Sequence, residues 1–303
     1  MQVSDRLVTA GGRDHDAVSN KTVIYRAKDA LVSIGYSGVA YVGDMPMDEW
    51  IAGTLWGGLP PRGADGVRPA KSLGFAPVTR DIGQAVAHLE QAIGGLGSAA
   101  IEAHGLYLTI AGWQENRNGM RPVVIEIERR AGVTTIRRSP RRFPKGQEFR
   151  VHSIGARVSA EAAQAHFASL RTARGLCCTI EDVETRLAAI IRETSTGSPG
   201  VGANLLSVRL PRPDLGWSMC RFLPAELHAV RIEAAQGSMV TDVAHCPWIV
   251  GPSVLYPPGV EVGETVLGLG GLPFVIVGAA PRAGLRGLSS SIRRPPPAGR
   301  PRR

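Results

Sequence analysis

The sequence predicts an α+β fold in which two β-sheets lie face to face between layers of helices, a four-layer αββα sandwich, followed by a β-rich extension. Two observations support this expectation. Apolar runs with the spacing of strands come in pairs, and helices with one apolar face come two in a row between those pairs. This order fits layered sheets better than a repeat of strand, helix and parallel strand. With 303 residues, the chain is long enough to bury such a core.

Three strands and the start of a helix are expected in the first fifty residues. A short strand covers residues 1–6, and a second begins at Ser19 after a polar turn rich in Gly and Asp. Residues 30–40 form a third, apolar strand that closes on small residues, and Asp48 opens a helix. We expect the ends of the first two strands to face each other across the turn.

Asp5 and Lys21 occupy those strand ends, sixteen residues apart. Their opposite charges predict a salt bridge. An Asp and a Lys at this separation are common by chance, so the pair indicates chemistry only together with the other motifs of the chain.

A loop and a helix follow. Residues 55–77 are rich in Gly and Pro and have no periodicity, so we expect a long loop, which in a compact domain is often functional or disordered. Thr79 is expected to cap the next helix, and Gly94-Gly95 to end it. Its apolar residues recur at spacings of 4, 3 and 4, which puts them on one face: Ile82, Val86, Leu89 and Ile93.

The next expected element is a β-hairpin. Apolar residues alternate over 106–110 and continue in a return strand over 123–127. Asn118-Gly119 lies between the two runs and is a strong turn signal.

Two further helices and a strand complete the expected sandwich. Ser159 caps the first helix, which runs to about Ala173 with Phe167 and Leu170 inward. Thr179-Ile-Glu-Asp182 has the pattern of a capping box and opens the second. The apolar face of this second helix is expected to contain Ile180, Val183, Leu187 and Ile190. A strand follows over residues 201–210.

The chain therefore divides into three expected parts: a sandwich domain over 1–212, a β-rich extension over 213–281 and a tail over 282–303. Strand patterns in the extension are bounded by Pro or Gly and cover 227–232, 238–242, 248–250 and 272–277. The sequence does not indicate what the extension does, beyond packing on the sandwich or on a neighbouring subunit.

The tail holds most of the chain's excess charge. It contains seven Arg and no acid, whereas the whole chain has a net charge of +9. A stretch so rich in Arg, Pro and Ser has too little apolar surface to order itself. It is either a solvated tail or a weak contact for polyanions.

Composition excludes several other classes of protein. No apolar run reaches the length of a membrane helix, and the N-terminus lacks the pattern of a signal peptide, so we expect a cytoplasmic protein. The four Cys show no CxxC spacing and no disulfide framework. We expect neither a metal nor an organic cofactor.

The order of motifs at the front of the chain resembles that of proteasome β-type subunits, in the N-terminal nucleophile hydrolase family, and of their uncharacterised bacterial relatives. That family places Asp-Arg at the end of its second strand and a Lys at the start of its third. An apolar strand, a small-residue turn and an Asp that opens the first long helix follow. Here Asp5-Arg6, Lys21, Gly35 to Gly38 and Asp48 fall in that order.

Later motifs are similar too. The strand that ends in Gly112-Trp113 turns back as the family's hairpin does. The family's Gly-Ser-Gly turn corresponds to residues 152–155, where Ser153 is displaced by one position or replaced by Ile154. Its Arg-Asp and Ser-Gly pairs correspond to residues 192–197, with Glu193 for Asp and Thr196-Gly197 for Ser-Gly.

The resemblance implies a threonine-type peptidase or amidohydrolase that acts on a peptide or amide. A hydroxyl on the first residue of the mature chain attacks the carbonyl, and the amine of the same residue takes the proton. Lys21 would lower the proton affinity of that centre, and Asp5 would hold Lys21 in position. Glu193 and Thr196 would orient a water or the amine by hydrogen bonds.

The nucleophile itself is the one part of the pattern that is missing. In the family it lies on a strand before the Asp-Arg strand, whereas this sequence begins inside that second strand, and removal of Met1 would expose Gln2. We therefore expect an N-terminally truncated hydrolase, inactive as given, with Thr, Ser or Cys upstream of Met1. The alternatives are a non-catalytic proteasome-like scaffold or interaction subunit, and a polyanion binder that acts through residues 282–303. Family members form rings, so the resemblance also implies a homo-oligomer.

Overall fold

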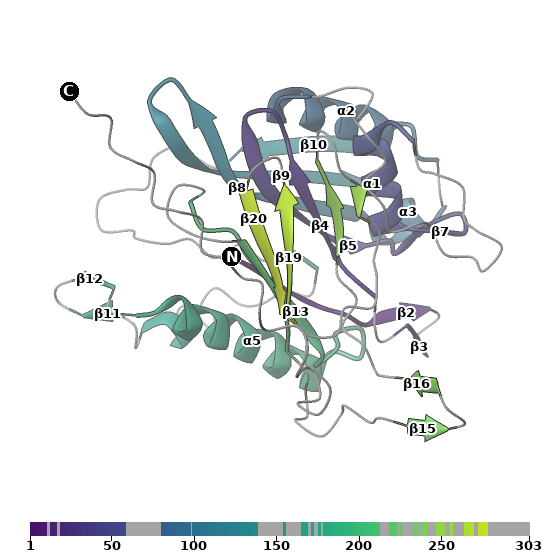
Figure 1. Ribbon diagram of the computed structural model, residues 1–303. Helices are drawn as coiled ribbons and strands as arrows, with labels where there is room; N and C mark the ends of the chain where they lie inside the picture. Colours follow the sequence, from purple (N-terminus) through teal and green to yellow (C-terminus); the bar gives the residue numbers. More distant parts are fainter. Residues whose placement is uncertain are drawn as a thin grey trace, which may run out of the picture.

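In the computed structural model the chain forms two main β-sheets with helices packed against them, a mixed α+β fold (Figure 1). The structure describes residues 1–10, 13–16, 19–58, 80–97, 99–138, 154–155, 165–168, 171–172, 175–176, 178–212, 218–223, 225, 233–235, 238–240, 247–251, 255–256, 264–269 and 272–277.

The larger sheet has seven strands in the order β10-β9-β8-β5-β4-β17-β18. Five of them come from one continuous part of the chain and pair in antiparallel fashion, whereas β17 joins β4 in parallel. The strands are β4 (Thr22–Arg26), β5 (Ala30–Gly38), β8 (Leu106–Asn116), β9 (Gly119–Arg130), β10 (Val133–Arg138), β17 (Trp248–Val250) and β18 (Leu255–Tyr256).

The smaller sheet has five strands in the order β1-β13-β14-β20-β19. They are β1 (Gln2–Asp5), β13 (Leu205–Arg209), β14 (Ser218–Leu223), β19 (Glu264–Leu269) and β20 (Leu272–Val277). Among the described residues, four short pairs of strands lie outside the two sheets. They are β2 (Val8–Ala10) with β3 (Arg13–Asp16), β6 (Tyr41–Val42) with β7 (Met45–Pro46), β11 (Arg171–Thr172) with β12 (Gly175–Leu176), and β15 (Glu233–Ala235) with β16 (Ser238–Val240).

Helices lie on opposite sides of the molecule. Figure 1 shows α1 (Met47–Trp56) and α2 (Ile82–Gly94) against the larger sheet, together with the short α3 (Ala99–His104). The long α5 (Ile180–Gly197) lies beside the smaller sheet. No helix in the described ranges is both long and apolar enough to cross a membrane.

Strand alternation divides the apolar residues between two cores. Val32 and Ile34 on β5 point toward α1 and α2 and belong to the large core there. Leu31, one position away, points to the other face and packs with Leu206 and Val208 of β13. Side chains of neighbouring positions thus hold the helices on one face and the second sheet on the other.

Most elements of the first half were predicted correctly. The hairpin turns at Asn118-Gly119, where Gly119 has a φ of 94°. The apolar face of α2 is buried as expected, and the helix ends at Gly94. The cap of α2, however, is Asp81, because its Oδ1 accepts the backbone N–H of Gln84 at 2.8 Å. Thr79 and residues 59–79 lie outside the described residues.

Other expectations need correction. Thr179 and Asp182 form the expected capping box, but Ile180 is 50% exposed and does not share the buried face of α5. Residues 171–172 belong to β11 rather than to a helix that reaches Ala173. The strand expected over 201–210 begins only at Leu205. The sequence did not predict α3 or β10.

The β-rich segment 213–281 contributes strands to the same two sheets as the preceding residues. β14, β19 and β20 extend the smaller sheet from β13, and β17 extends the larger sheet from β4. Each sheet therefore takes strands from both sides of residue 212. Residues 282–303, the expected tail, lie outside the described residues.

Candidate functional site

The structure joins Asp5 and Lys21 in an ion pair between the two sheets. Asp5 ends β1 in the smaller sheet, and Lys21 comes directly before β4 in the larger one. Lys21 Nζ donates to Asp5 Oδ1 at 2.8 Å, and each side chain is 16% exposed. The predicted contact is therefore present, in a position that is partly shielded from water.

Backbone donors fix the Asp5 carboxylate. Its Oδ1 accepts the N–H of Leu7 at 3.0 Å and the N–H of Gly202 at 3.3 Å, in addition to Lys21. Gly202 lies in the loop between α5 and β13, where a Cβ would come within 2.7 Å of Leu7 Cβ. The absence of a side chain at Gly202 thus lets the loop approach Asp5.

Lys21 is positioned by its own backbone and by the two residues before it. Arg6 Nε donates to the carbonyl of Ser19 at 3.3 Å, and the Tyr36 hydroxyl donates to the carbonyl of Asn20 at 3.0 Å. The N–H of Tyr36 donates to the carbonyl of Lys21 at 3.3 Å. Burial, with a smaller effect from Asp48, raises the pKa of Tyr36 well above its ordinary value, so this hydroxyl stays a donor.

The Lys21 ammonium retains donor capacity. An ammonium has three N–H donors, and Asp5 is its one acceptor among the described residues. The nearby hydroxyls are occupied elsewhere: Ser4 Oγ and Thr22 Oγ1 lie 3.2 Å apart, and Gln2 Nε2 donates to Thr22 Oγ1 at 3.0 Å. The ammonium can therefore stabilise a further acceptor beside Asp5.

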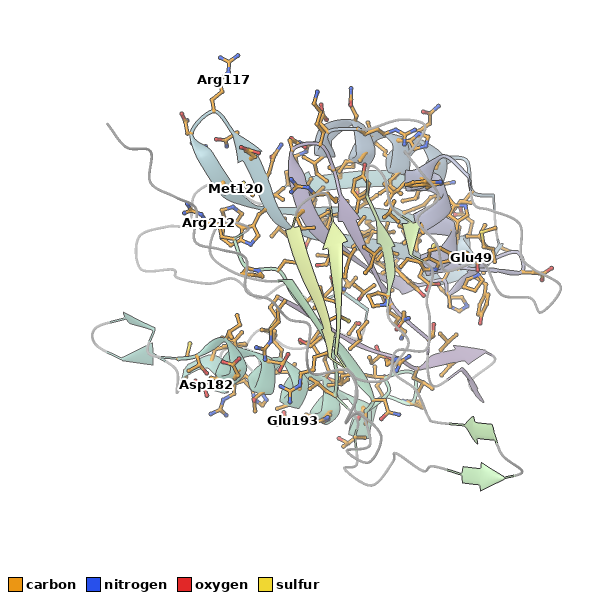
Figure 2. The ribbon with its side chains drawn as sticks, viewed as in Figure 1. Glu49, Arg117, Met120, Asp182, Glu193 and Arg212 are labelled. Atoms are coloured by element: carbon orange, nitrogen blue, oxygen red, sulfur yellow. The ribbon has the colours of Figure 1, made fainter. Side chains whose placement is uncertain are left out.

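Glu193 and Thr196 lie near the end of α5, and each has a partner of its own. Figure 2 labels Glu193 on this helix. Glu193 is 67% exposed, and its Oε2 lies 2.9 Å from His166 Nε2. The Thr196 hydroxyl donates to the carbonyl of Glu193 at 2.7 Å. From this region it is Gly202, rather than Glu193 or Thr196, that contacts Asp5, so the catalytic roles of these two residues stay predictions. Ser153 lies outside the described residues.

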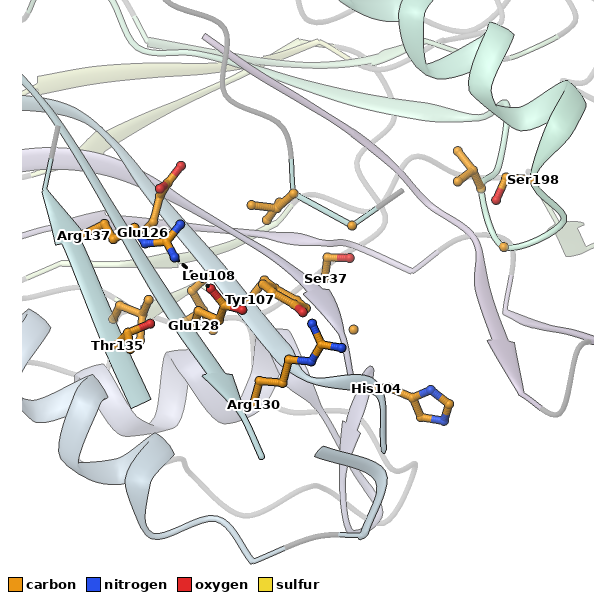
Figure 3. A pocket seen from close by; sticks show the side chains of 16 residues that line it. Ser37, His104, Tyr107, Leu108, Glu126, Glu128, Arg130, Thr135, Arg137 and Ser198 are labelled. Atoms are coloured by element: carbon orange, nitrogen blue, oxygen red, sulfur yellow. Dashed lines mark ion pairs between the residues drawn. The ribbon is translucent and has the colours of Figure 1, made fainter. Parts of the chain in front are cut away.

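A pocket of about 630 Å³ is lined by residues from β5, β8, β9 and β10 and from the loop after α5 (Figure 3). Gly200 and Val201 line it on one side, directly before Gly202. Ser37 lines it from the end of β5, directly after Tyr36. Along the chain, this lining thus adjoins Gly202, which contacts Asp5, and Tyr36, which contacts the backbone of Lys21.

The polar lining of this pocket was not recognised from the sequence. It comes from β8, β9 and β10 and includes Tyr107, Glu126, Glu128, Arg130, Thr135 and Arg137. The signal was the alternation on β9, where charged residues occupy every second position from 126 to 130. Among the described residues, no cluster of His, Cys, Asp and Glu is arranged to hold a metal ion.

Comparison with known proteins identifies no family. No family model matches the sequence, and no curated protein matches it. Among solved structures the chain is similar to Anbu (ancestral beta-subunit) from Yersinia bercovieri, with 12% sequence identity and a TM-score of 0.41. The alignment covers 67% of this chain and 74% of that chain.

Proposed function

We propose that this chain is a proteasome-like N-terminal nucleophile peptidase or amidohydrolase, built on an αββα sandwich, with Asp5 and Lys21 as supporting residues of its active centre. The observation that carries the proposal is the ion pair between Asp5 and Lys21, which connects the two sheets and is supported by Gly202 and Tyr36, the chain neighbours of two pocket-lining residues. The order of motifs at the front of the sequence supports the same assignment.

The nucleophile would come from a residue on a strand beside β1. In the described smaller sheet β1 is the outer strand, with β13 on one side, so its other edge is a place where a strand can add. The hydroxyl or thiol of that residue attacks the amide carbonyl carbon while its proton passes to the residue's own amine. The leaving amine takes this proton as the C–N bond breaks, and water then releases the acyl group. Lys21 lowers the proton affinity of the attacking centre by its charge.

The second candidate is a proteasome-like scaffold or interaction subunit without catalysis. One observation favours it: no hydroxyl or thiol within the described ranges contacts Lys21 Nζ, and the ion pair alone can serve to hold the sheets together. Assembly into a homo-oligomeric ring is part of both proposals and rests on the resemblance of the sequence.

The test is to determine the N-terminus of the native protein by intact mass and terminal sequencing, and to assay hydrolysis of fluorogenic peptides by the same preparation. A mature chain that begins with Thr, Ser or Cys ahead of Asp5 and cleaves peptides is the expected result. Lys21→Ala should then lower kcat/KM by about 100-fold or more. Lys28→Ala is the matched control, because Lys28 is exposed and makes no side-chain ion pair among the described residues.

A native chain that begins at Met1 or Gln2 and cleaves no peptide would overturn the hydrolase proposal. The scaffold would then be the better description, provided that size-exclusion chromatography with light scattering shows a stable assembly. A monomer without activity would contradict both.

A further inference from the structure

The pocket lies on the face of the larger sheet that elsewhere packs on the smaller sheet. At one end of this face, Leu31 and Trp113 pack against residues of β13. At the other end of the same strands, Ser37 pairs with Tyr107, and both line the pocket. One face of the sheet is thus apolar where the second sheet covers it and polar where the pocket opens.

Strand β9 presents alternating side chains to this pocket. Glu126, Glu128 and Arg130 line it with charged side chains, whereas Ile125 and Ile127 belong to the core under the helices, and of these two Ile127 also borders the pocket. Two residues carry positive charge in this part of the lining, Arg137 and Arg130. Arg137 lies 3.7 Å from Glu128, and the dashed line in Figure 3 marks this ion pair.

Arg130 has no such partner within the part of the chain that the structure describes. Its neighbour Arg129 points the other way and hydrogen-bonds to Leu96, Gly132 and Thr134. Figure 3 shows Arg130 extending from β9 toward Tyr107 and Ser37. A guanidinium and two hydroxyl groups therefore line the same open pocket.

We propose that this pocket binds a peptide carboxylate, with Arg130 as the recognising cation and the Tyr107 and Ser37 hydroxyls as additional donors. A guanidinium pairs with a carboxylate through two parallel hydrogen bonds, which gives the contact direction as well as strength. The inference rests on the proposed function, because it assigns the pocket to the substrate of the same site.

The charges of the lining favour a single negative charge over a multiply charged ligand. Glu126 and Glu128 offset Arg130 and Arg137, so the four side chains together are neutral. A phosphate group or a nucleic acid would meet the two carboxylates with more negative charge than one guanidinium can compensate. A carboxylate from an acidic side chain or from a peptide C-terminus carries one negative charge, which the guanidinium of Arg130 alone can pair.

The location connects this contact to the reacting centre. The wall formed by Gly200 and Val201 continues directly to Gly202, whose N–H binds Asp5. We expect a peptide whose carboxylate is held by Arg130 to extend toward this segment, which leads along the chain to Gly202. Arg130 would select which peptide binds and would take no part in breaking the amide bond.

The experiment measures binding of dansyl-labelled peptides to the full chain by fluorescence anisotropy. The probes are Ala-Ala-Glu and Ala-Ala-Gln, each as the free acid and as the C-terminal amide, and a phosphoserine peptide amide. We expect peptides with a carboxylate to bind more tightly than the Gln amide, which has none, and more tightly than the phosphoserine peptide. If the Glu peptide amide binds more tightly than the Gln free acid, the ligand is an acidic side chain. If the Gln free acid binds more tightly than the Glu amide, the ligand is the C-terminal carboxylate.

Arg130→Gln should weaken binding of the preferred peptide by about 10- to 100-fold, since it removes a charge-assisted hydrogen-bond pair. Arg130→Lys keeps the positive charge but lacks the planar guanidinium, so its affinity for the preferred peptide should lie between those of Arg130→Gln and the unsubstituted chain. Arg117→Gln is the matched control: it removes the same charge from the tip of the β8–β9 hairpin, outside the pocket (Figure 2), and should leave binding unchanged.

Equal affinity for all probes, or equal affinity of Arg130→Gln and the unsubstituted chain, would overturn this inference. The proposed hydrolase can fail independently. If Arg130-dependent binding is found and the native protein begins at Met1 or Gln2 and cleaves no peptide, the pocket assignment stands and the catalytic proposal falls. If peptides are cleaved without preference for a carboxylate, the hydrolase stands and the role of Arg130 falls.

Discussion

At the scale of single residues, hydrogen bonds to the backbone around Lys21 are as much a part of the candidate site as the two charges of Asp5 and Lys21. Three consecutive carbonyls, from Ser19 to Lys21, each accept a hydrogen bond from Arg6 or Tyr36. The sequence predicted the pairing of Asp5 with Lys21 because both residues flank expected strands. It did not predict Tyr36 or Gly202 as supports, because their contacts depend on how loops and strands far apart in the chain meet.

Gly202 provides a test of this support. Gly202→Ala would place a Cβ 2.7 Å from Leu7 Cβ, so the loop must move away from Asp5. We expect a loss of about 1 to 3 kcal/mol in the free energy of unfolding, measured by urea denaturation. Gly200→Ala is the control, because its nearest neighbour, Thr9 Oγ1, would be 3.8 Å away. Equal effects of the two substitutions would show that close packing at Gly202 does not matter.

Tyr25 makes stability depend on alkaline pH. Burial raises its pKa to about 12, whereas an unfolded chain has a Tyr pKa of about 10. The folded state thus holds this proton more tightly, and the contribution is complete below pH 10 and is lost as the pH rises toward 12. When the pH is raised from 8 to 11, we expect the free energy of unfolding, measured by urea titration, to fall by roughly 1 kcal/mol less for Tyr25→Phe than for the unsubstituted chain. Equal losses would contradict the assignment.

At the scale of elements, α5 is tied to the smaller sheet by buried charges. Arg209 of β13 donates to both oxygens of Glu184 on α5, at 3.0 and 2.6 Å, and both residues are buried. Arg221 adds a contact to Glu184 at 3.2 Å, and the exposed Glu181 also accepts from Arg209. The helix therefore carries a buried acid on the face where the sequence predicted only apolar residues.

Loss of one partner in this cluster should be costly. Glu184→Gln leaves Arg209 buried with only Glu181, so we expect a loss of about 3 kcal/mol in the free energy of unfolding. The double variant Glu184→Leu with Arg209→Met removes both charges and should regain much of that loss, since buried ion pairs exchange well for packed apolar groups. Glu181→Gln, at an exposed position, should have a much smaller effect. A large effect of Glu181→Gln with none for Glu184→Gln would contradict this account.

The same cluster predicts sensitivity to acid. Burial alone would raise the pKa of Glu184, but hydrogen bonds from Arg209 and the charges of Arg209 and Arg221 outweigh it and lower the pKa. Glu184 then stabilises the fold above the ordinary Glu pKa of about 4.3, and this stabilisation is lost as the pH falls below it. The free energy of unfolding, measured by urea titration, should therefore fall less from pH 7 to pH 4 for Glu184→Gln than for the unsubstituted chain.

Local elements were predicted well where the sequence contains their cause. The capping box of α5 and the Asn118-Gly119 turn depend on residues within a few positions of each other, and both were predicted. The cap of α2 is Asp81 and not the predicted Thr79, because Asp81 and Gln84 form a capping box at this helix start. Ile180 follows the apolar period but lies at the exposed first turn, so periodicity alone placed it on the wrong face.

At the scale of the whole molecule, strand pairing was the part that the sequence did not predict. β17 pairs in parallel with β4, more than two hundred residues earlier, and β20 pairs in parallel with β14. Partner choice over such distances depends on which faces can be buried together, and a strand's own residues do not encode it. For this reason residues 213–281 were expected as an extension, although they supply strands to both sheets.

The chain end carries a prediction that concerns the molecule's charge as a whole. Residues 282–303 lie outside the described residues and hold seven of the nine net positive charges. If this tail contacts polyanions, the full chain should bind heparin with an affinity that falls steeply as the salt concentration rises. The reason is that each bound Arg displaces counterions from the polyanion. Deletion of 282–303 should abolish retention at physiological salt and leave the melting temperature unchanged, since a tail so poor in apolar residues adds little to a core. Unchanged retention after the deletion would place the basic surface elsewhere, and a lowered melting temperature would show that the tail packs on the fold.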